Sequence, residues 1–234
     1  MDFYDTDNKY AEYINRIKFN DNRINTFIFD MDGTTLDTLC DLTVSINFVL
    51  NKFDMPKRDV SEIRKFVGNG IREAFRLAVL DGTPASVLDE MLPIFKEHYD
   101  IHCLDNTRPY EGITDVLCSL REKGLKTAIV SNKIDSAVQE LYEKFFSESV
   151  DIAIGEQEGI NRKPAPDMVN LALQKLNSTR EESIYIGDSE VDLLTANNSN
   201  LPCISVLWGF RDKEYLINQG AYCFAKEPRD ILKL

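Results

Sequence analysis

Short apolar runs, separated by amphipathic stretches, recur along most of the chain. They do not alternate between apolar and polar residues, and such unbroken runs are typical of strands buried on both faces of a parallel sheet. The predicted strands are 26–30, 126–132, 150–155, 183–188, 203–209 and 221–225. Helical periodicity between them predicts helices over 111–123, 134–146, 164–176 and 189–198. Strands that alternate with helices predict βαβ units, and therefore a doubly wound, parallel α/β sheet.

One long gap interrupts this alternation. After 26–30 the next strand-like run begins only at residue 126, and the stretch 37–107 has helical periodicity throughout. The helices predicted there are 38–52, 59–66, 70–80 and 84–102, the last kinked or broken at Pro93. We therefore expect a helical insert after the first strand, with "LDNTRPY" (104–110) as the linker back to the sheet.

The first 23 residues precede this pattern. They form an acidic start that contains a short amphipathic segment, with apolar positions at Tyr10, Tyr13, Ile14 and Ile17. This periodicity predicts a surface helix packed on the domain. The expected organisation is an N-terminal extension (1–23), an α/β core domain (24–36 and 108–234) and a helical domain inserted at 37–107.

Composition and charge narrow the class of protein. No apolar run is long enough to cross a bilayer, and the polar start "MDFYDTDNKY" is unlike a secretory signal. The five cysteines are scattered without CxxC spacing, which indicates reduced thiols in a cytoplasmic protein and argues against a disulfide framework or a zinc site. A net charge of −12 argues against nucleic acid and anionic membranes as partners. An anionic substrate would need local positive charge.

Polar side chains follow three of the predicted strands. Because ligands bind beyond the carboxyl ends of parallel strands, we expect these side chains to meet in one crevice. They are Asp30 and Asp32 after 26–30, Ser131 and Asn132 at the end of 126–132, Asp188 and Asp192 after 183–188, and Lys163 just before the helix expected at Pro164 or Ala165.

This set of residue types indicates phosphoryl transfer. Several carboxylates in one crevice repel one another unless a cation lies among them, and oxygen ligands suit Mg²⁺. A lysine supplies positive charge for a phosphate, serine and asparagine supply neutral donors, and Gly33 allows close approach of backbone N–H groups. A carboxylate would serve as the nucleophile, and Asp32 is placed to act as general acid and then as general base.

Each motif alone has an ordinary structural explanation. An Asp-x-Asp pair is common in turns and at helix N-termini, and "KPAP" is more often a loop with a solvated lysine. An EF-hand interpretation of "DMDGTTLD" fails, because that loop needs glycine at its sixth position, where this chain has Thr35. The specificity therefore lies in the order of the motifs and in their placement at strand ends.

Four segments together resemble a known family. "FDMDGTTLDT" (29–38), "VSN" (130–132), "RKPAPD" (162–167) and "IGDSEVD" (186–192) are similar to the four ordered motifs of the haloacid dehalogenase (HAD) superfamily of phosphohydrolases. The resemblance runs from about Asn25 to the C-terminus. The segment 37–107 resembles the helical cap of phosphoglycolate-phosphatase-like members. The resemblance implies a Rossmann-like core with a cap inserted after the first strand.

The resemblance also implies roles for the acidic residues. Asp30 would be the nucleophile, passing through an aspartyl-phosphate, and Asp32 would be the general acid and base. The carboxylates of Asp30 and Asp188, with the backbone carbonyl of Asp32, would bind Mg²⁺. Asp192 would orient Lys163 or a metal-bound water. In the dehalogenases proper the position of Asp32 is not acidic, so halide chemistry is disfavoured here.

The same resemblance assigns phosphate-binding residues. Ser131, Asn132 and Lys163 would hold the phosphate, with backbone help from Gly33. Cap residues choose the leaving group in this family. The segment "GNGIRE" nominates Arg72 to meet a substrate carboxylate, against the ordinary interpretation of a solvated arginine on a helix.

The leading hypothesis is a Mg²⁺-dependent phosphatase acting on a small phosphorylated metabolite, with phosphoglycolate as the first candidate, in a monomer or homodimer. A phosphomutase of the β-phosphoglucomutase kind is the alternative enzyme, because it shares every core motif. A receiver-like signalling module, phosphorylated on an aspartate without turnover, is the alternative outside enzymes. Hinges are expected at the two joins of the insert, near 34–37 and 106–109.

Overall fold

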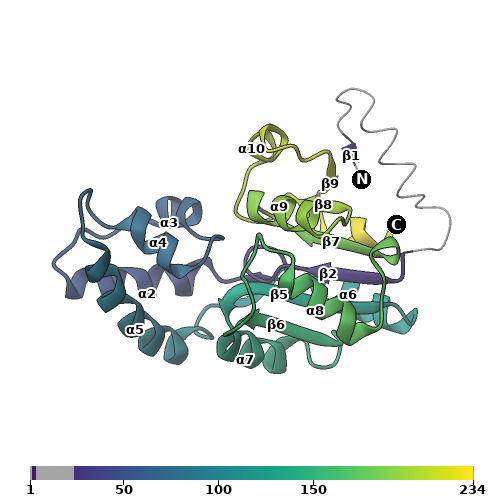
Figure 1. Cartoon of the computed structure of the whole chain (residues 1–234), viewed down its shortest axis with the longest axis horizontal. Helices are drawn as coiled ribbons and strands as arrows, with labels where there is room; N and C mark the ends of the chain where they lie inside the picture. Colours follow the sequence, from purple (N-terminus) through teal and green to yellow (C-terminus); the bar gives the residue numbers. More distant parts are fainter. Residues whose placement is uncertain (1, 4–23, 234) are drawn as a thin grey trace.

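The computed structural model describes residues 2–3 and 24–233, so the amphipathic segment predicted within 1–23 lies outside the described residues. A central sheet carries helices on both faces, and a separate group of helices lies beyond one end of the strands (Figure 1). The strand ends of this sheet position the residues of the predicted site.

The order of the described strands is β1-β9-β8-β7-β2-β5-β6. The strands are β1 (Asp2–Phe3), β2 (Thr26–Phe29), β5 (Lys126–Ile134), β6 (Ile152–Glu156), β7 (Ser183–Gly187), β8 (Cys203–Val206) and β9 (Cys223–Ala225). All pair in parallel except β1, which pairs antiparallel with β9. From the central β2 the chain builds outward through β5 and β6, then returns to build β7, β8 and β9 on the other side. The predicted doubly wound sheet is confirmed, and its switch point lies between β2 and β7.

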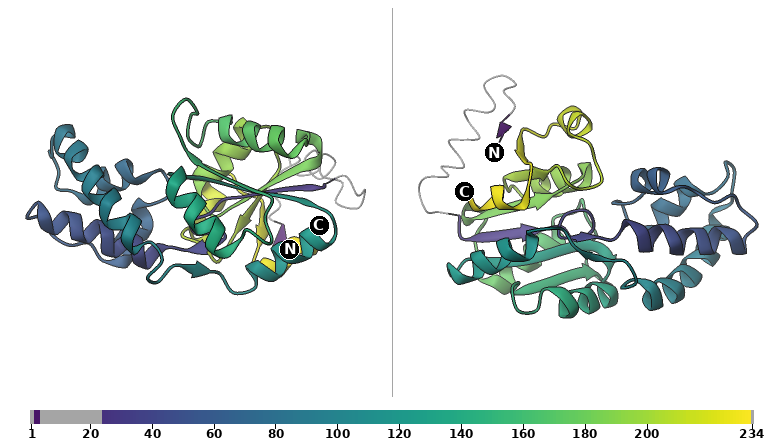
Figure 2. Two further views of the ribbon diagram at one scale, coloured as in Figure 1. Left: turned by 90° about the horizontal axis from the view of Figure 1, so that it is seen from below. Right: turned by 180° about the vertical axis from the view of Figure 1, so that it is seen from behind.

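Helices enclose the sheet from both sides (Figure 2). Phe27 and Phe29 of β2 pack with α6 (Ile113–Glu122) and α7 (Asp135–Phe145), whereas Ile28 packs with α8 (Asp167–Leu176) and α9 (Glu190–Asn198). Both faces of β2 are therefore buried, which explains why its sequence does not alternate. The remaining elements near the C-terminus are η1 (Arg180–Glu182), α10 (Lys213–Asn218) and η2 (Pro228–Lys233).

Two helix ends test the sequence predictions. Gly124 follows the end of α6 with φ 70°, and its N–H donates to the carbonyl oxygen of Arg121 at 2.8 Å, as expected of a C-terminal cap. The start predicted for α8 is wrong by about three residues, because the helix begins at Asp167. Prolines at 164 and 166 disfavour helical backbone in the residue before each of them, so Lys163 lies in a loop ahead of the helix.

The insert forms four helices, α2 (Leu39–Lys52), α3 (Val60–Phe66), α4 (Ile71–Ala78) and α5 (Ala85–His102), which we call the cap. They pack around their own core, which includes Ile46, Phe75 and Phe95. The helix α5 is continuous, so the predicted break at Pro93 is wrong. Pro93 is exposed, and water can solvate the carbonyl that its missing N–H leaves unpaired.

The two chain segments that join the cap to the sheet lie side by side. They pair as β3 (Leu36–Asp37) and β4 (Arg108–Pro109) in a two-stranded antiparallel ribbon. The buried carboxylate of Asp41, in the first turn of α2, accepts hydrogen bonds from the backbone N–H groups of Asn106 at 2.9 Å and Thr107 at 2.8 Å. Asp41 therefore ties the outgoing segment to the returning one.

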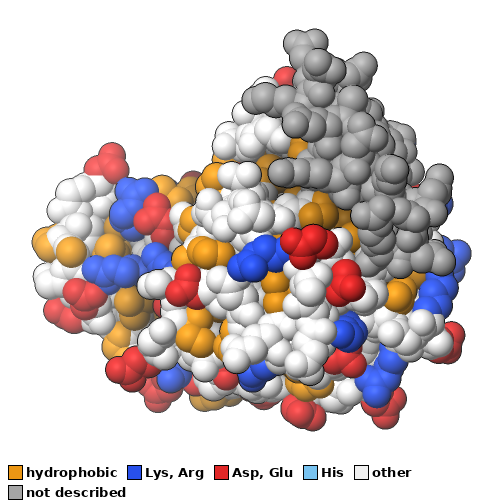
Figure 3. Space-filling model, turned by 45° about the vertical axis from the view of Figure 1, so that its right-hand side comes forward, with side chains coloured by type: hydrophobic (Ala, Val, Ile, Leu, Met, Phe, Trp, Pro, Cys, Tyr) orange, Lys and Arg blue, Asp and Glu red, His pale blue; other side chains and the backbone are white. Residues whose placement is uncertain are grey.

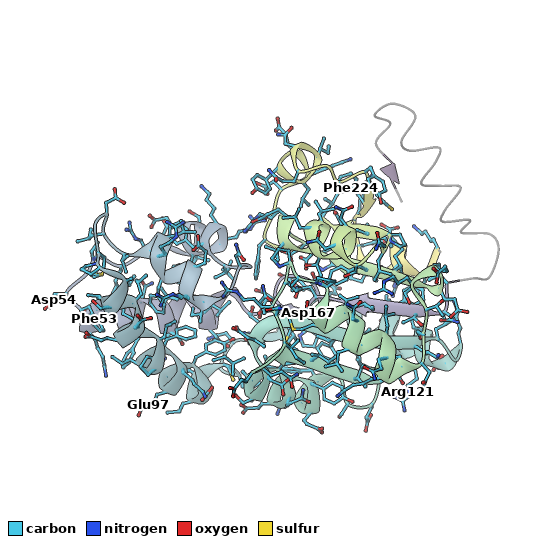
Figure 4. The ribbon with its side chains drawn as sticks, in the orientation of Figure 1. Phe53, Asp54, Glu97, Arg121, Asp167 and Phe224 are labelled. Atoms are coloured by element: carbon cyan, nitrogen blue, oxygen red, sulfur yellow. The ribbon has the colours of Figure 1, made fainter. Side chains whose placement is uncertain are left out.

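One face of the molecule is mixed in charge. Lys and Arg side chains lie among Asp and Glu side chains on the face shown in Figure 3. Phe53 and Asp54 mark the end of α2 that lies away from the sheet (Figure 4). Among the described residues, no helix combines the length and the apolar character needed to cross a membrane.

Candidate active site

A cavity that is open to solvent lies between the cap and the carboxyl ends of the central strands. Asp30 and Asp32 line it from the end of β2, and Ser131 and Asn132 line it from β5. The cap side of the same cavity consists mainly of apolar side chains. The strand ends thus bring residues from distant parts of the sequence to one edge, as the doubly wound topology predicts.

Lys163 is the centre of a buried charge cluster at this edge. Its Nζ lies 2.7 Å from Asp30 Oδ1, 2.9 Å from Asp192 Oδ1 and 3.1 Å from the hydroxyl of Tyr185. The side chain of Lys163 is only 2% exposed. Burial lowers its pKa, but the carboxylates of Asp192 and Asp30 outweigh burial and raise the pKa well above the ordinary value. The ammonium therefore stays charged and holds both aspartates.

Asp192 uses both carboxylate oxygens within the protein. Oδ1 accepts from Lys163 and from the hydroxyl of Tyr185 at 3.1 Å. Oδ2 accepts from the backbone N–H of Ser189 at 3.1 Å and from its hydroxyl at 2.7 Å. A Ser-x-x-Asp pattern at a helix N-terminus, as in a capping box, produces this arrangement. Asp192 therefore orients Lys163.

Asp188 lies at the end of β7 and is held by two loops. Its Oδ2 accepts from the backbone N–H of Phe210 at 2.7 Å, and its Oδ1 accepts from the hydroxyl of Thr34 at 3.3 Å. Gly33 has φ 86°, and a Cβ at that position would lie 2.5 Å from Asp188 Oδ2. The N–H of Gly33 donates to the carbonyl oxygen of Leu36 at 2.9 Å. Within this structure, glycine at position 33 makes room for the carboxylate of Asp188.

The acidic residues fit a divalent cation. One carboxylate oxygen each from Asp30, Asp188 and Asp192 lie within 4.8 Å of one another, and all three residues are buried. Burial, followed by repulsion from Asp192, raises the pKa of Asp30 well above its usual range and that of Asp188 to about 7. Buried carboxylates arranged in this way bind either protons or a cation, and their hard oxygens suit Mg²⁺. Each oxygen of Asp192 already accepts two hydrogen bonds, whereas each oxygen of Asp188 accepts one, so Asp30 and Asp188 are the better ligands.

Asp32 has a partner that the sequence did not predict. Lys133 Nζ lies 3.0 Å from Asp32 Oδ1 and 2.7 Å from the hydroxyl of Tyr99 in the cap helix α5. Burial opposes the charged form of Lys133, but Asp32 and Tyr99 outweigh burial and raise the pKa of this lysine above its ordinary value. Lys133 directly follows Asn132 at the end of β5. This position was the sequence feature that could have indicated that Lys133 belongs to the site.

The predicted phosphate-binding residues lie at the same edge. Ser131 Oγ accepts from the backbone N–H of Lys133 at 3.2 Å, and Asn132 Nδ2 donates to the backbone carbonyl of Lys163 at 3.0 Å. Asn132 Oδ1 is buried and has no hydrogen-bond partner within the part of the chain that the structure describes. An unpartnered buried oxygen beside the cavity is a feature of binding sites.

The structure does not bring Arg72 to the cavity. This residue lies in the first turn of α4, where its half-exposed guanidinium pairs with Asp89 of α5. Its neighbours Ile71 and Ala74 line the cavity instead. The phase of the helix therefore turns Arg72 outward, in agreement with the ordinary interpretation of a surface arginine.

Several residues at the site were missed by sequence reasoning. Ser189 could have been found from the Ser-x-x-Asp pattern, and Tyr185 carries a hydroxyl between two isoleucines of a strand run. Tyr99 and Phe210 carry no local signal, because their roles depend on how the cap and a C-terminal loop pack against the sheet.

Comparison with known proteins places this arrangement in a family. A family model described as haloacid dehalogenase-like hydrolase matches residues 27–206. Phosphoglycolate phosphatase 1 of Pseudomonas aeruginosa is 27% identical over 212 residues, covering 88% of this chain and 77% of that protein. Pyrophosphatase PpaX of Listeria monocytogenes is 30% identical over 219 residues, covering 91% of this chain and 96% of that protein.

Solved structures agree with the sequence comparisons. A crystal structure from Lactobacillus delbrueckii subsp. bulgaricus, provisionally assigned as a phosphoglycolate phosphatase, has a TM-score of 0.85 and 36% identity. The match covers 89% of this chain and 97% of that one. The family model spans the cap and all four motifs described above. The chain therefore belongs to the haloacid dehalogenase-like hydrolase family and is a hydrolase of the phosphatase kind.

Proposed function

We propose that the chain is a Mg²⁺-dependent phosphatase that hydrolyses a small phosphomonoester through an aspartyl-phosphate on Asp30. The observation that carries this proposal is the position of Asp30 at the carboxyl end of β2. There it lines the cavity while Lys163 holds one of its oxygens at 2.7 Å. A carboxylate fixed by a buried sheet and a buried ammonium is suited to attack an electrophile at one defined point.

The reaction has two steps. In the first, a carboxylate oxygen of Asp30 forms a bond to phosphorus while the bond from phosphorus to the leaving oxygen breaks, and Asp32 gives that oxygen a proton. In the second, Asp32 takes a proton from water, the water oxygen bonds to phosphorus, and the bond to Asp30 breaks. Inorganic phosphate leaves, and both aspartates return to their starting states.

Neutral donors and one cationic side chain would hold the phosphate. Ser131 and Asn132 line the cavity from β5, and Lys163, whose donors are taken by Asp30, Asp192 and Tyr185, would contribute its positive charge beside the nucleophile. The hydrogen bond from Asn132 Nδ2 to the backbone carbonyl of Lys163 joins the end of β5 to the loop that contains Lys163. The glycine at position 33 allows the loop after β2 to lie close to Asp188.

The carboxylates of Asp30 and Asp188 and the backbone carbonyl of Asp32 would bind Mg²⁺. When bound, the ion screens the repulsion between the Asp30 carboxylate and the anionic phosphate. Asp192 would remain outside the ligand set, because Lys163, Tyr185 and Ser189 occupy its oxygens.

The names of the relatives guide the choice of substrate. They are a phosphoglycolate phosphatase and a pyrophosphatase, whose substrates are small and strongly anionic. Phosphoglycolate is therefore the first candidate for this chain. A phosphomutase would use the same core residues, and it is distinguished by its product.

The test is phosphate release from a panel of small phosphomonoesters with Mg²⁺. We expect steady release with excess substrate, and a loss of at least about 10³-fold in Asp30→Asn. Asp115→Asn is the matched control, because this exposed aspartate on α6 lies away from the cavity. An isomer in place of free phosphate would indicate a mutase, and a single phosphorylation without turnover would indicate a receiver-like module. Full activity of Asp30→Asn would refute the assignment.

A further inference from the structure

A second buried lysine lies at the cavity, outside the cluster around Lys163. The Nζ of Lys133 lies 3.0 Å from Asp32 Oδ1 and 2.7 Å from the hydroxyl of Tyr99, and 4.4 Å from the centre of the Tyr99 ring. Its side chain is 7% exposed. An ammonium has three N–H donors, and these two partners account for two of them. Since Lys133 also lines the cavity, the third donor is available to a bound molecule.

The position of Lys133 differs from that of Lys163. Lys163 is shared between two carboxylates, Asp30 and Asp192, on the core side of the site. Lys133 pairs with one carboxylate, Asp32, and reaches the cap through Tyr99 of α5. Asp32 is the residue proposed to protonate the leaving oxygen, so the atoms attached to that oxygen must lie next to Asp32. Lys133 is therefore the buried cation beside the leaving group.

Most of the rest of the cap wall is apolar, and its two charged residues, Lys96 and Asp100 of α5, are exposed to solvent. Leu42, Val67, Ile71, Ala74 and Phe95 face the same cavity. Such a wall offers few partners to the hydroxyl groups of a sugar, and burying these groups without partners is unfavourable. A single ammonium in an apolar setting instead favours one anionic group, because its attraction is weakly screened there.

We propose that Lys133, oriented by Tyr99, is a specificity-determining residue that binds an anionic group on the leaving part of the substrate. This inference rests on the proposed phosphatase function and assigns its substrate class. The anionic group is a carboxylate, as in phosphoglycolate, or a second phosphate, as in pyrophosphate. Tyr99 is a positioning residue, since it acts through the ammonium of Lys133.

The test compares substrates that carry the anionic group with one that lacks it. Ethyl phosphate has the carbon skeleton of phosphoglycolate without the carboxylate, and pyrophosphate supplies the second kind of anion. The readout is the ratio of kcat/KM for phosphoglycolate, or for pyrophosphate, to kcat/KM for ethyl phosphate. In Lys133→Met we expect this ratio to fall roughly 10- to 100-fold, mainly through KM, since a charge-assisted hydrogen bond is lost.

Three further variants distinguish a direct contact between Lys133 and the anionic group from an effect of Lys133 on Asp32. Lys133→Arg keeps the charge and should retain part of the ratio, and Tyr99→Phe should lower it by only about 3- to 10-fold. Lys144→Met is the matched control, because this lysine is exposed on α7. A loss common to all substrates reports the effect of Lys133 on Asp32, whereas a change in the ratio reports the anion contact. An unchanged ratio in a folded Lys133→Met protein would overturn the proposal.

A binding measurement keeps this test separate from catalysis. In the Asp30→Asn background, with Mg²⁺, calorimetry should show that Lys133→Met weakens phosphoglycolate or pyrophosphate binding about tenfold or more, with ethyl phosphate binding nearly unchanged. If no panel compound is turned over but this difference in binding is found, the phosphatase assignment fails and the anion site stands. If turnover is found and Lys133→Met binds all ligands as before, the anion site fails alone.

Discussion

The two sides of the cavity are built from different kinds of residue. The core side consists of charged groups from a strand end, a loop and a helix that hold one another, such as Lys163 between Asp30 and Asp192. The cap side consists mainly of apolar side chains from three helices, with Tyr99 as its buried polar contact to the core. On the core side, a small displacement of one charged side chain breaks several ion pairs and hydrogen bonds together. On the cap side, packing determines the shape and contributes few specific bonds.

Phe210 shows where the two sides meet. Its side chain is buried in the core of the cap, while its backbone N–H donates to the carboxylate of Asp188. Next to it, Arg211 donates to the backbone carbonyls of Arg64 and Val67 in the cap and pairs with Glu190. This loop connects cap docking to the proposed metal ligand. This difference between the two sides predicts large losses of activity and stability from substitutions on the core side. Substitutions nearer the cap should have smaller effects.

Lys163→Met should have the largest effect. It leaves the carboxylates of Asp30 and Asp192 buried together without their shared cation, and such a loss destabilises by about 3–5 kcal/mol. Phosphate release should fall at least about 10²-fold, because the charge beside the nucleophile is gone. Urea unfolding without Mg²⁺ measures the first effect. Lys175→Met, on the exposed side of α8, is the control. Equal unfolding curves for the two variants would contradict the description of a tightly coupled core.

Gly33→Ala tests the close approach of the loop after β2 to Asp188. A Cβ there would lie 2.5 Å from Asp188 Oδ2, so the carboxylate must move. We expect Mg²⁺ to raise the melting temperature of the natural protein, because it binds the folded state, and to have little effect on the variant. Stability without the metal should fall by about 1–3 kcal/mol.

Gly220→Ala provides a matched control for this change. Its φ of 94° carries a similar backbone strain, but nothing lies within 4 Å of the added Cβ. This variant should lose stability and keep the full response to Mg²⁺. If both variants respond equally to Mg²⁺, the position of Asp188 does not depend on Gly33.

Much of the core side could be predicted from the sequence. Asp30 and Asp188 each follow a buried strand and Ser131 lies near the end of β5, and parallel strands end at a common edge, so their proximity follows from topology. The contact of Lys133 with Tyr99 could not be predicted, because it joins a strand end to a helix of the separately packed cap. The position of Arg72 outside the cavity lining could not be predicted, for a related reason. A shift of one residue along α4 turns a side chain from the cavity to the surface.

Asp41→Asn tests the tie between the two joining segments. The variant loses the charged acceptor for the backbone N–H groups of Asn106 and Thr107, which should lower stability by about 1–3 kcal/mol. Burial opposes the charged form, but the hydrogen bonds from Asn106 and Thr107 outweigh it and lower the pKa of Asp41 below its ordinary value. The unfolded chain therefore binds the proton more readily than the folded one.

The lowered pKa of Asp41 determines how the stability difference between the natural protein and this variant depends on pH. The stability that Asp41 contributes is fully present above the ordinary aspartate pKa of about 3.9 and is lost as the pH falls through its lower folded value. The gap between the natural protein and Asp41→Asn should be constant from about pH 7 to 5 and should narrow toward pH 3. Urea unfolding across this range measures the gap, with the exposed Asp115→Asn as control. A gap that widens on acidification would contradict the assignment.

Arg72→Ala should have the smallest effect, although Arg72 is the cap residue that the sequence nominated for the substrate. Its half-exposed pair with Asp89 contributes at most about 1 kcal/mol, and solvent screens such a pair. We expect kcat/KM for phosphoglycolate to change less than about twofold, whereas Lys133→Met reduces it strongly. The same assay at high salt should leave the difference between these two variants intact, because Lys133 is buried and Arg72 is not. A tenfold loss in Arg72→Ala would show that this guanidinium turns inward when substrate binds, and would transfer the anion site from the core–cap boundary to the cap.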